Sequence, residues 1–348
     1  FEEDVLANSY IDLNPSYDES QNAYPIRISV KEGTDMTSLA PIFELTPGAT
    51  ISPASGSVQN FTTPVRYTVT SEDKAWHRVY AITAREQKAS NIPTTYHFEK
   101  VRIMQNVWQE FYEEQDSGNE LTWASGNKGF KRAMSEAATE DYPTTQIDNG
   151  KTGKCVKLET RLTGDLGNMV GMPIAAGNLF IGSFDMLNAI TNPLSATRFG
   201  TPFYNKPLRL TGYYKYKAGE QFYENGEYTS RKDIFNIYAI FYDGVKYDSA
   251  GKGTDVTLDG NLPNQNYEHS SMVALALVSN PQETEGDEWK FFDIPFDYQR
   301  YGKKIDEARL AKGEYKIGII FASSKDGATF EGAPGSTLLI DEVELIYE

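Results

Sequence analysis

The sequence predicts an all-β protein built from two β-sandwich domains, a small one followed by a larger jelly roll. Short strand patterns recur at regular spacing over the first 90 residues, and longer apolar strand patterns follow one another over the second half. A helical pattern is limited to residues 303–310. The length of 348 residues is too great for one ordinary sandwich and suits two domains of unequal size.

The N-terminal domain, residues 1–90, is predicted from short strands separated by turn formers. Its strand patterns lie at residues 25–30, 39–45, 65–70 and 78–83. The segment TPGATISPASG, which follows the second of them, is dense in turn-forming residues. This rhythm is typical of a small sandwich, and the strands carry no cluster of ionisable side chains. A polar segment at 86–95 is the predicted linker.

The second domain, residues 96–348, has a loop-rich first half and a strand-rich second half. Residues 234–242 are apolar on both faces, which predicts a strand lying between two layers. Further strand patterns lie at 272–278, 289–296, 315–322 and 336–347. The polar segment 246–266 predicts a long surface loop or hairpin, which either borders a site or is a tip with no role.

The clearest strand pattern is KPLRLTGYYKYK at residues 206–217, which has two distinct faces. One face carries Leu208, Leu210, Gly212, Tyr214 and Tyr216, and the other carries Arg209, Thr211, Tyr213, Lys215 and Lys217. If the leucine face is core, Tyr214 and Tyr216 are core as well, and Tyr213 with Arg209 is the better candidate for a ligand. We expect this strand to share a sheet with 234–242 and 289–296. Gly212 leaves room for a ligand or for a close-packed aromatic ring.

Charge and cysteine content exclude several classes of function. The net charge is −16 and no basic patch is visible, which argues against nucleic acid and anionic lipid and suits a neutral ligand. The single cysteine, Cys155, allows neither an internal disulfide nor a cysteine-based metal site, and its strand pattern predicts a buried thiol. No apolar run approaches the ~18 residues that span a bilayer. Because the chain begins at Phe1 rather than Met, we expect a trimmed N-terminus.

Aromatic residues are the strongest indication of a binding surface. The chain has 22 Tyr, 18 Phe and 4 Trp, and flat rings with polar handles stack on the C–H faces of sugars as well as favouring strands. Trp123 lies in a loop rich in Gly, Asn and Ser, where an aromatic ring is more often exposed. The alternative is that these rings pack between the sheets. The candidate ligand-binding residues are Trp123, Arg209, Tyr213, Tyr238, Tyr242 and Trp289.

Catalytic and metal-binding patterns are weaker. Asp185, Asp233, Asp243 and Asp293 lie nearest to apolar strands and could have raised pKa values, or they could be solvated strand ends, so no catalytic pair is assigned. Three histidines in unrelated places give no zinc or triad pattern, and no nucleotide-binding motif occurs. Glu99 and Asp341, near the first and last strands of the second domain, are candidate ligands of a structural calcium or ordinary surface acids.

The N-terminal domain resembles a known module. GATISPASG at 48–56 and FTTPVRYTVTSED at 61–73 are similar to the immunoglobulin-like N-terminal modules of secreted lipoproteins from gut bacteria that use glycans. This resemblance covers residues 1 to about 87. It implies a spacer between a lipid anchor and a working domain.

The second domain resembles the putative carbohydrate metabolism domain of surface lipoproteins, over roughly residues 96–348. The resemblance implies a jelly roll and a role in glycan handling. The segments that carry it are WASGN (123–127), AGNLFIG (176–182), FGTPF (199–203), GYYKY (212–216), IYA (237–239), SSKDG (323–327) and LIDEV (339–343).

These observations lead to three hypotheses. The first is a carbohydrate-binding protein of the cell surface or periplasm, exported and lipid-anchored, that captures a poly- or oligosaccharide and needs no cofactor beyond the calcium considered above. The second is a glycoside hydrolase or lyase on the same jelly roll. The third is a structural or adhesive surface protein that binds another protein. The sequence leaves open whether the protein is an enzyme.

Overall fold

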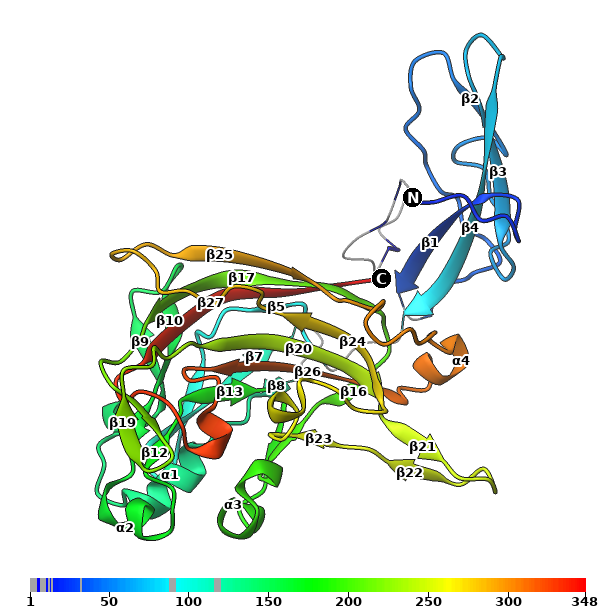
Figure 1. Cartoon of the computed structure of the whole chain (residues 1–348). Coiled ribbons are helices and arrows are strands. Elements are labelled where there is room, and N and C mark those ends of the chain that lie inside the picture. The colour runs from blue at the N-terminus through cyan, green and yellow to red at the C-terminus, as the bar shows by residue number, and fades with distance from the viewer. Residues whose placement is uncertain are drawn as a thin grey trace. The chain divides into compact units, whose positions relative to one another are not determined.

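The computed structural model describes residues 5–6, 11, 13, 15–31, 33–87, 92–115 and 120–348 (Figure 1). The chain forms two compact units. The first comprises Phe1–Ser90 with Tyr204–Lys206 and Ile346–Glu348, and the second comprises Asn91–Phe203 and Pro207–Leu345. The predicted linker at 86–95 includes residues 88–91, which lie outside the described residues.

The first unit contains one four-stranded sheet with the order β1-β4-β3-β2, in which β1 and β4 are parallel. The strands are β1 (Tyr24–Lys31), β2 (Thr50–Ser52), β3 (Val65–Thr70) and β4 (His77–Gln87). Leu39 and Phe61, from the connection between β1 and β3, pack on this sheet against Val30 and Tyr67. The strand predicted at 39–45 is wrong: only a single bridge joins Leu39 to Gln59, because Pro41 lacks the N–H that would continue the ladder.

The second unit is a sandwich of two sheets, which confirms the predicted all-β fold class (Figure 1). The six-stranded sheet has the order β25-β17-β27-β10-β9, with β5 also paired to β27. The five-stranded sheet has the order β13-β26-β20-β24, with β16 also paired to β26, and each of its pairs is antiparallel. The strands of the first sheet are β5 (Thr95–Tyr96), β9 (Thr144–Asp148), β10 (Lys154–Glu159), β17 (Pro207–Lys217), β25 (Lys290–Pro295) and β27 (Thr337–Tyr347). Those of the second are β13 (Asn178–Phe180), β16 (Thr201–Phe203), β20 (Asn236–Asp243), β24 (Met272–Leu277) and β26 (Tyr315–Ala322).

Strand β17 alternates from Gly212 onward as its sequence predicts, whereas Thr211, predicted for the outer face, is buried and Leu208 is only half-buried. Leu210, Tyr214 and Tyr216 are buried, whereas Tyr213 and Lys215 are only half-buried. Its neighbour on one side is β25, as expected, and its other neighbour is β27. The prediction that 234–242 lies in the same sheet is wrong, because β20 belongs to the five-stranded sheet.

The segment 234–242 instead faces β17 across the sandwich. The ring of Phe235 lies 4.8 Å from the rings of both Tyr214 and Tyr216. Periodicity identifies which face of a strand is buried, but it does not distinguish a partner in the same sheet from one in the opposite layer.

The five-stranded sheet is buried on both faces, which confirms the prediction that β20 lies between two layers. Residues Asn236 to Tyr242 are all buried. Tyr238, Ile240 and Tyr242 belong to a second hydrophobic cluster, together with Phe199 and Tyr267 from an outer layer. That layer contains the sheet of β14 (Gly182–Phe184), β15 (Thr197–Phe199) and β23 (Leu258–Asp259).

Short helices lie beside the same outer layer. Figure 1 shows α1 (Asn127–Ala133), α2 (Gly164–Met169) and α3 (Asn188–Thr191) on the side of the five-stranded sheet that faces away from the six-stranded sheet. The predicted helix at 303–310 is the short α4 (Glu307–Leu310), where the Asp306 carboxylate accepts the N–H groups of Ala308 and Arg309.

Small antiparallel elements complete the second unit. The segment 246–266 contributes most of one hairpin and all of β23, as the prediction of a hairpin required. In the described part of the chain, no helix is both long and apolar enough to cross a membrane. The remaining strands are β6 (Val101–Met104), β7 (Trp108–Glu114) and β8 (Glu120–Thr122), and the pairs β11 (Arg161–Leu162) with β12 (Ile174–Ala175), β18 (Phe222–Glu224) with β19 (Glu227–Thr229), and β21 (Val245–Tyr247) with β22 (Gly253–Asp255).

Candidate functional site

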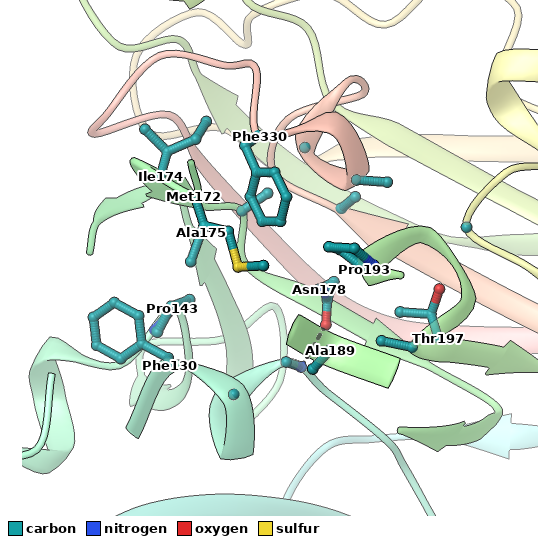
Figure 2. Close-up of a pocket in the computed structure, with 18 of the residues that line it drawn as sticks. Phe130, Pro143, Met172, Ile174, Ala175, Asn178, Ala189, Pro193, Thr197 and Phe330 are labelled. Carbon is teal, nitrogen blue, oxygen red and sulfur yellow. Dashed lines mark hydrogen bonds between the residues drawn. The ribbon is translucent and has the colours of Figure 1, made fainter. Parts of the chain in front are cut away.

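A cavity of about 550 Å³ lies on the outer side of the five-stranded sheet, within the second unit (Figure 2). Strands β13, β20 and β26 contribute one wall, and α1, α2, the segment 172–176, α3 and the turn 324–330 contribute the others. Figure 2 shows Phe130 and Pro143 on one side of the hollow and Pro193 and Ala189 on the other. The volume lies in the ~300–1,000 Å³ range of small-molecule sites.

The side chains that line this cavity are mainly apolar. The few polar groups include Asn178, whose Oδ1 accepts the Gly126 N–H at 2.7 Å. The Oγ1 of Thr197 is buried without a hydrogen-bond partner. Tyr238 is 2% exposed, and burial raises the pKa of its hydroxyl well above the ordinary value. The apolar lining residues are Phe130, Pro143, Leu166, Val170, Met172, Ile174, Phe180, Phe184, Met186, Pro193, Phe199, Pro263, Ile320, Phe330 and seven alanines.

The charged groups of the cavity are all cationic. Arg132 and Lys325 line it, and the described residues of the lining include no Asp or Glu. General acid–base hydrolysis of a glycosidic bond usually needs two carboxyl groups. The cavity therefore lacks the acid pair of an ordinary glycoside hydrolase.

A second surface lies on the outer side of the six-stranded sheet, and we call it the β17–β25 aromatic face. Tyr213 and Phe291 occupy paired positions of the two strands, with ring centroids 5.2 Å apart. Arg209 Nε donates to Asp293 Oδ1 at 2.6 Å, and Lys215 Nζ lies 4.9 Å from the centroid of the Trp289 ring. Phe291 is 53% exposed, so this aromatic surface faces solvent.

The β17–β25 aromatic face brings together three of the six candidate ligand-binding residues, Arg209, Tyr213 and Trp289. Phe291 was missed, although it alternates with the buried Phe292 and stands beside Trp289 in the sequence. The same period of two that selected Tyr213 would have selected it.

The other three candidates lie in the interior. Trp123 is 1% exposed, and its ring packs against Tyr96 and Phe321. Tyr242 is fully buried and donates to the Phe199 carbonyl at 2.6 Å. These two rings therefore take the alternative role, that of core packing. Tyr238 alone reaches the cavity.

Tertiary contacts explain why the loop around Trp123 is not exposed. The backbone N–H of Trp123 donates to the Phe111 carbonyl at 2.9 Å, and Ala124 and Phe180 exchange backbone hydrogen bonds at the same distance. These contacts hold the loop against β13. They join segments far apart in the chain, so local composition carries no sign of them.

The four acids nearest to apolar strands are all held by donors. Asp233 is 2% exposed and accepts the hydroxyls of Ser324 and Ser336, at 2.6 and 2.7 Å. Burial raises the pKa of Asp233, and these donors oppose the rise. The remaining three are Asp185, which accepts the Leu187 N–H, Asp243, which takes two bonds from Arg309, and Asp293, which pairs with Arg209.

Glu99 and Asp341 both accept hydrogen bonds from the turn at residues 152–154. Glu99 Oε1 accepts the Lys154 N–H at 2.8 Å, and Asp341 Oδ2 accepts the Thr152 N–H at 3.0 Å. Burial raises the pKa of Asp341 to about 6. Within the residues that the structure describes, no three His, Cys, Asp or Glu side chains cluster in a way that could hold a metal ion. The calcium site stays a prediction.

Cys155 is fully buried in β10. Burial, together with the nearby Asp341 carboxylate, raises the pKa of its thiol to about 12. The predicted buried, structural thiol is confirmed.

Comparison with known proteins identifies the two parts of the chain. The family model of the putative carbohydrate metabolism domain matches residues 97–346, and the model of the N-terminal domain of surface glycan-binding proteins matches residues 12–84. No curated protein matches the chain.

Two solved structures are similar over most of this chain. A putative glycoside hydrolase from Bacteroides thetaiotaomicron VPI-5482 is 46% identical, with a TM-score of 0.67, over 94% of this chain and 91% of its own. A putative glycoside hydrolase from Bacteroides vulgatus ATCC 8482 is 50% identical, with a TM-score of 0.68, over 74% of this chain and 98% of its own. The match of 250 residues to one family model, together with these relatives, shows that this chain belongs to the putative carbohydrate metabolism domain family.

Proposed function

We propose that the protein captures a poly- or oligosaccharide on the β17–β25 aromatic face, as a carbohydrate-binding protein of the cell surface. The observation that carries the proposal is the grouping of Tyr213, Trp289 and Phe291 with Arg209 and Asp293 on one solvent-facing surface. Membership in a carbohydrate-related family supports the same class of ligand.

The chemistry of this face suits a neutral sugar. Aromatic rings pack against the apolar C–H faces of a pyranose, while charged side chains beside them hydrogen-bond its hydroxyls. Asp293 and Arg209 are 39% and 42% exposed at their side chains, so both side chains reach the solvent. Because the chain carries a net charge of −16, a neutral glycan approaches it without the repulsion that an acidic polymer meets.

The N-terminal unit supports the proposed location. Its match to the N-terminal domain of surface glycan-binding proteins suggests a surface-associated protein. In this proposal the unit is a spacer, and a lipid anchor upstream holds the protein to the membrane.

The test measures the binding of a panel of polysaccharides and of a glycan array by the unmodified protein. The same measurements are made with Tyr213→Ala, Trp289→Ala and the double variant. Loss of one stacked ring should weaken binding about tenfold, and loss of both about a hundredfold, since each ring contributes about 1.5 kcal/mol. Tyr228→Ala is the matched control, because Tyr228 is 52% exposed on β19, outside this face. Unchanged binding by the double variant would refute the proposed surface.

Glycoside hydrolysis is the second candidate, because a relative that is 46% identical is named a putative glycoside hydrolase. The same incubations, analysed for new reducing ends and released oligosaccharides, decide between the two. Binding without products supports capture. Product release that Asp293→Asn abolishes would assign catalysis to this face instead.

A further inference from the structure

We propose that the cavity beside the five-stranded sheet binds an amphiphilic carboxylate. Its apolar body would occupy the hollow, and its carboxylate would lie at Arg132 and Lys325. This site is separate from the glycan surface proposed above, which lies on the other sheet.

The apolar lining of the cavity disfavours a sugar as its ligand. Side chains such as Phe180, Phe184 and Ile320 surround a volume of about 550 Å³. A sugar that entered would bring many hydroxyls against carbon atoms, and each buried hydroxyl without a partner is costly. An acyl chain or an aromatic body of similar volume loses no hydrogen bonds there, and it gains from leaving water.

The charges of the cavity select the head group. Arg132 and Lys325 belong to its lining, both are exposed to solvent, and the described part of that lining has no carboxylate. Guanidinium and ammonium groups form charge-assisted hydrogen bonds with a carboxylate.

The apolar surface continues from the cavity to the solvent. Leu166 and Val170 belong to the lining and are 51% and 53% exposed, and the neighbouring Met169 is 82% exposed. Exposed apolar side chains grouped at the edge of a hollow mark ligand entrances and interaction sites. Here they provide a path along which an acyl chain can enter.

The binding test uses the full chain and a fluorescent fatty acid, 11-(dansylamino)undecanoate, followed by displacement. We expect saturable binding with one site per chain and displacement by dodecanoate. Affinity should rise about fourfold for each methylene added from octanoate to dodecanoate. Dodecanol should displace at least tenfold less well, and dodecyltrimethylammonium should not compete. Equal displacement by dodecanol would overturn the anionic head group, and absence of saturable binding would overturn the site.

Two variants locate the ligand. The double variant Arg132→Glu/Lys325→Glu should weaken dodecanoate binding at least tenfold and leave dodecanol binding unchanged, with the exposed Lys312→Glu as its control. Figure 2 shows Ala189 of α3 at the cavity, and Ala189→Trp should fill the hollow. This variant should abolish the binding of both dodecanoate and dodecanol. Circular dichroism checks that each variant is folded. Unaffected dodecanoate binding in both variants would place the ligand elsewhere. Tyr213→Ala/Trp289→Ala should leave probe binding intact, so failure of one proposal is distinguishable from failure of the other.

Discussion

The ring of Tyr213 lies 5.2 Å from the ring of Phe291 on the outer face of the six-stranded sheet. The next residue, Tyr214, is 2% exposed and packs against Phe235 inside the sandwich. Two adjacent tyrosines therefore have opposite environments, as the period of two in the sequence predicts.

This difference makes a stability prediction. Tyr214→Ala should lower the free energy of unfolding by about 3–5 kcal/mol, because it leaves a cavity in the core. Tyr213→Ala should lower the free energy of unfolding by about 1 kcal/mol or less, because one side of the Tyr213 ring is already exposed to water in the folded chain. Urea unfolding followed by circular dichroism gives both values. Similar losses for the two variants would contradict the assignment of faces.

The sequence was sufficient to predict the fold class, the two-faced β17 and the double burial of β20, because each depends on local periodicity. It was insufficient for the neighbours of β17. Pairing with β27 rather than with 234–242 depends on which distant strands meet, and both choices bury the same tyrosines.

The candidate site shows the same limit. Arg209, Tyr213 and Trp289 could be predicted because a strand presents its alternate residues together. The cavity could not, because residues as distant as Gly126 and Phe330 line it and come from turns and short helices that have no shared period. Trp123 was misplaced for a related reason, since the contacts that bury its loop are all long-range.

Gly212 gives a second prediction, because its missing side chain accommodates an aromatic ring. A Cβ at this position would lie 2.7 Å from Phe292 Cζ and 2.9 Å from Val343 Cγ2. Gly212→Ala should therefore lower the free energy of unfolding by about 1–3 kcal/mol. Phe292→Leu in the same chain removes the nearest atom and should recover part of the loss, measured by urea unfolding as a double-mutant cycle. Additive losses would show that overpacking is not the cause.

Asp341 gives a prediction about pH. Burial raises its pKa to about 6 in the folded chain, above the unfolded value of 3.8. The folded state therefore favours the protonated form, and the stabilisation is complete below pH ~4 and is lost as pH rises to about 6. The loss should reach about 1–3 kcal/mol. Unfolding free energies from pH 4 to 8 for the original chain should show this fall, and the fall should be smaller for Asp341→Asn, in which only the other buried carboxyl groups contribute. A parallel profile for the two would refute it.

Calcium bound by Glu99 and Asp341 would act in the opposite direction, because it binds the ionised carboxylates. Calcium that binds only the folded chain raises the melting temperature with concentration. The sequence hypothesis therefore expects 5 mM calcium chloride to raise the melting temperature at pH 7, and Glu99→Gln/Asp341→Asn to abolish the rise. Magnesium at the same concentration controls for ionic strength. An unchanged melting temperature would contradict calcium binding by these two carboxylates.

The buried Asp233 carboxylate joins three distant parts of the second unit and gives the last prediction. Its Oδ2 accepts the hydroxyls of Ser324 and Ser336 and, at 2.7 Å, the N–H of Ala333, while Oδ1 accepts the N–H of Ile234 at 2.9 Å. Asp233→Ala would leave four donors unsatisfied in the interior. It should cost about 3–5 kcal/mol of unfolding free energy.

Asp287→Ala is the control for Asp233→Ala, because the Asp287 side chain is 99% exposed and forms a surface ion pair with Lys215. Removing such a surface pair should cost about 1 kcal/mol or less. Asp233→Asn keeps the size of the side chain but turns an amide N–H₂ toward donors, so it should remain destabilised by at least ~2 kcal/mol. Recovery to the original stability by Asn would show that packing volume, rather than the carboxylate's hydrogen bonds, holds Ser324, Ala333 and Ser336 together.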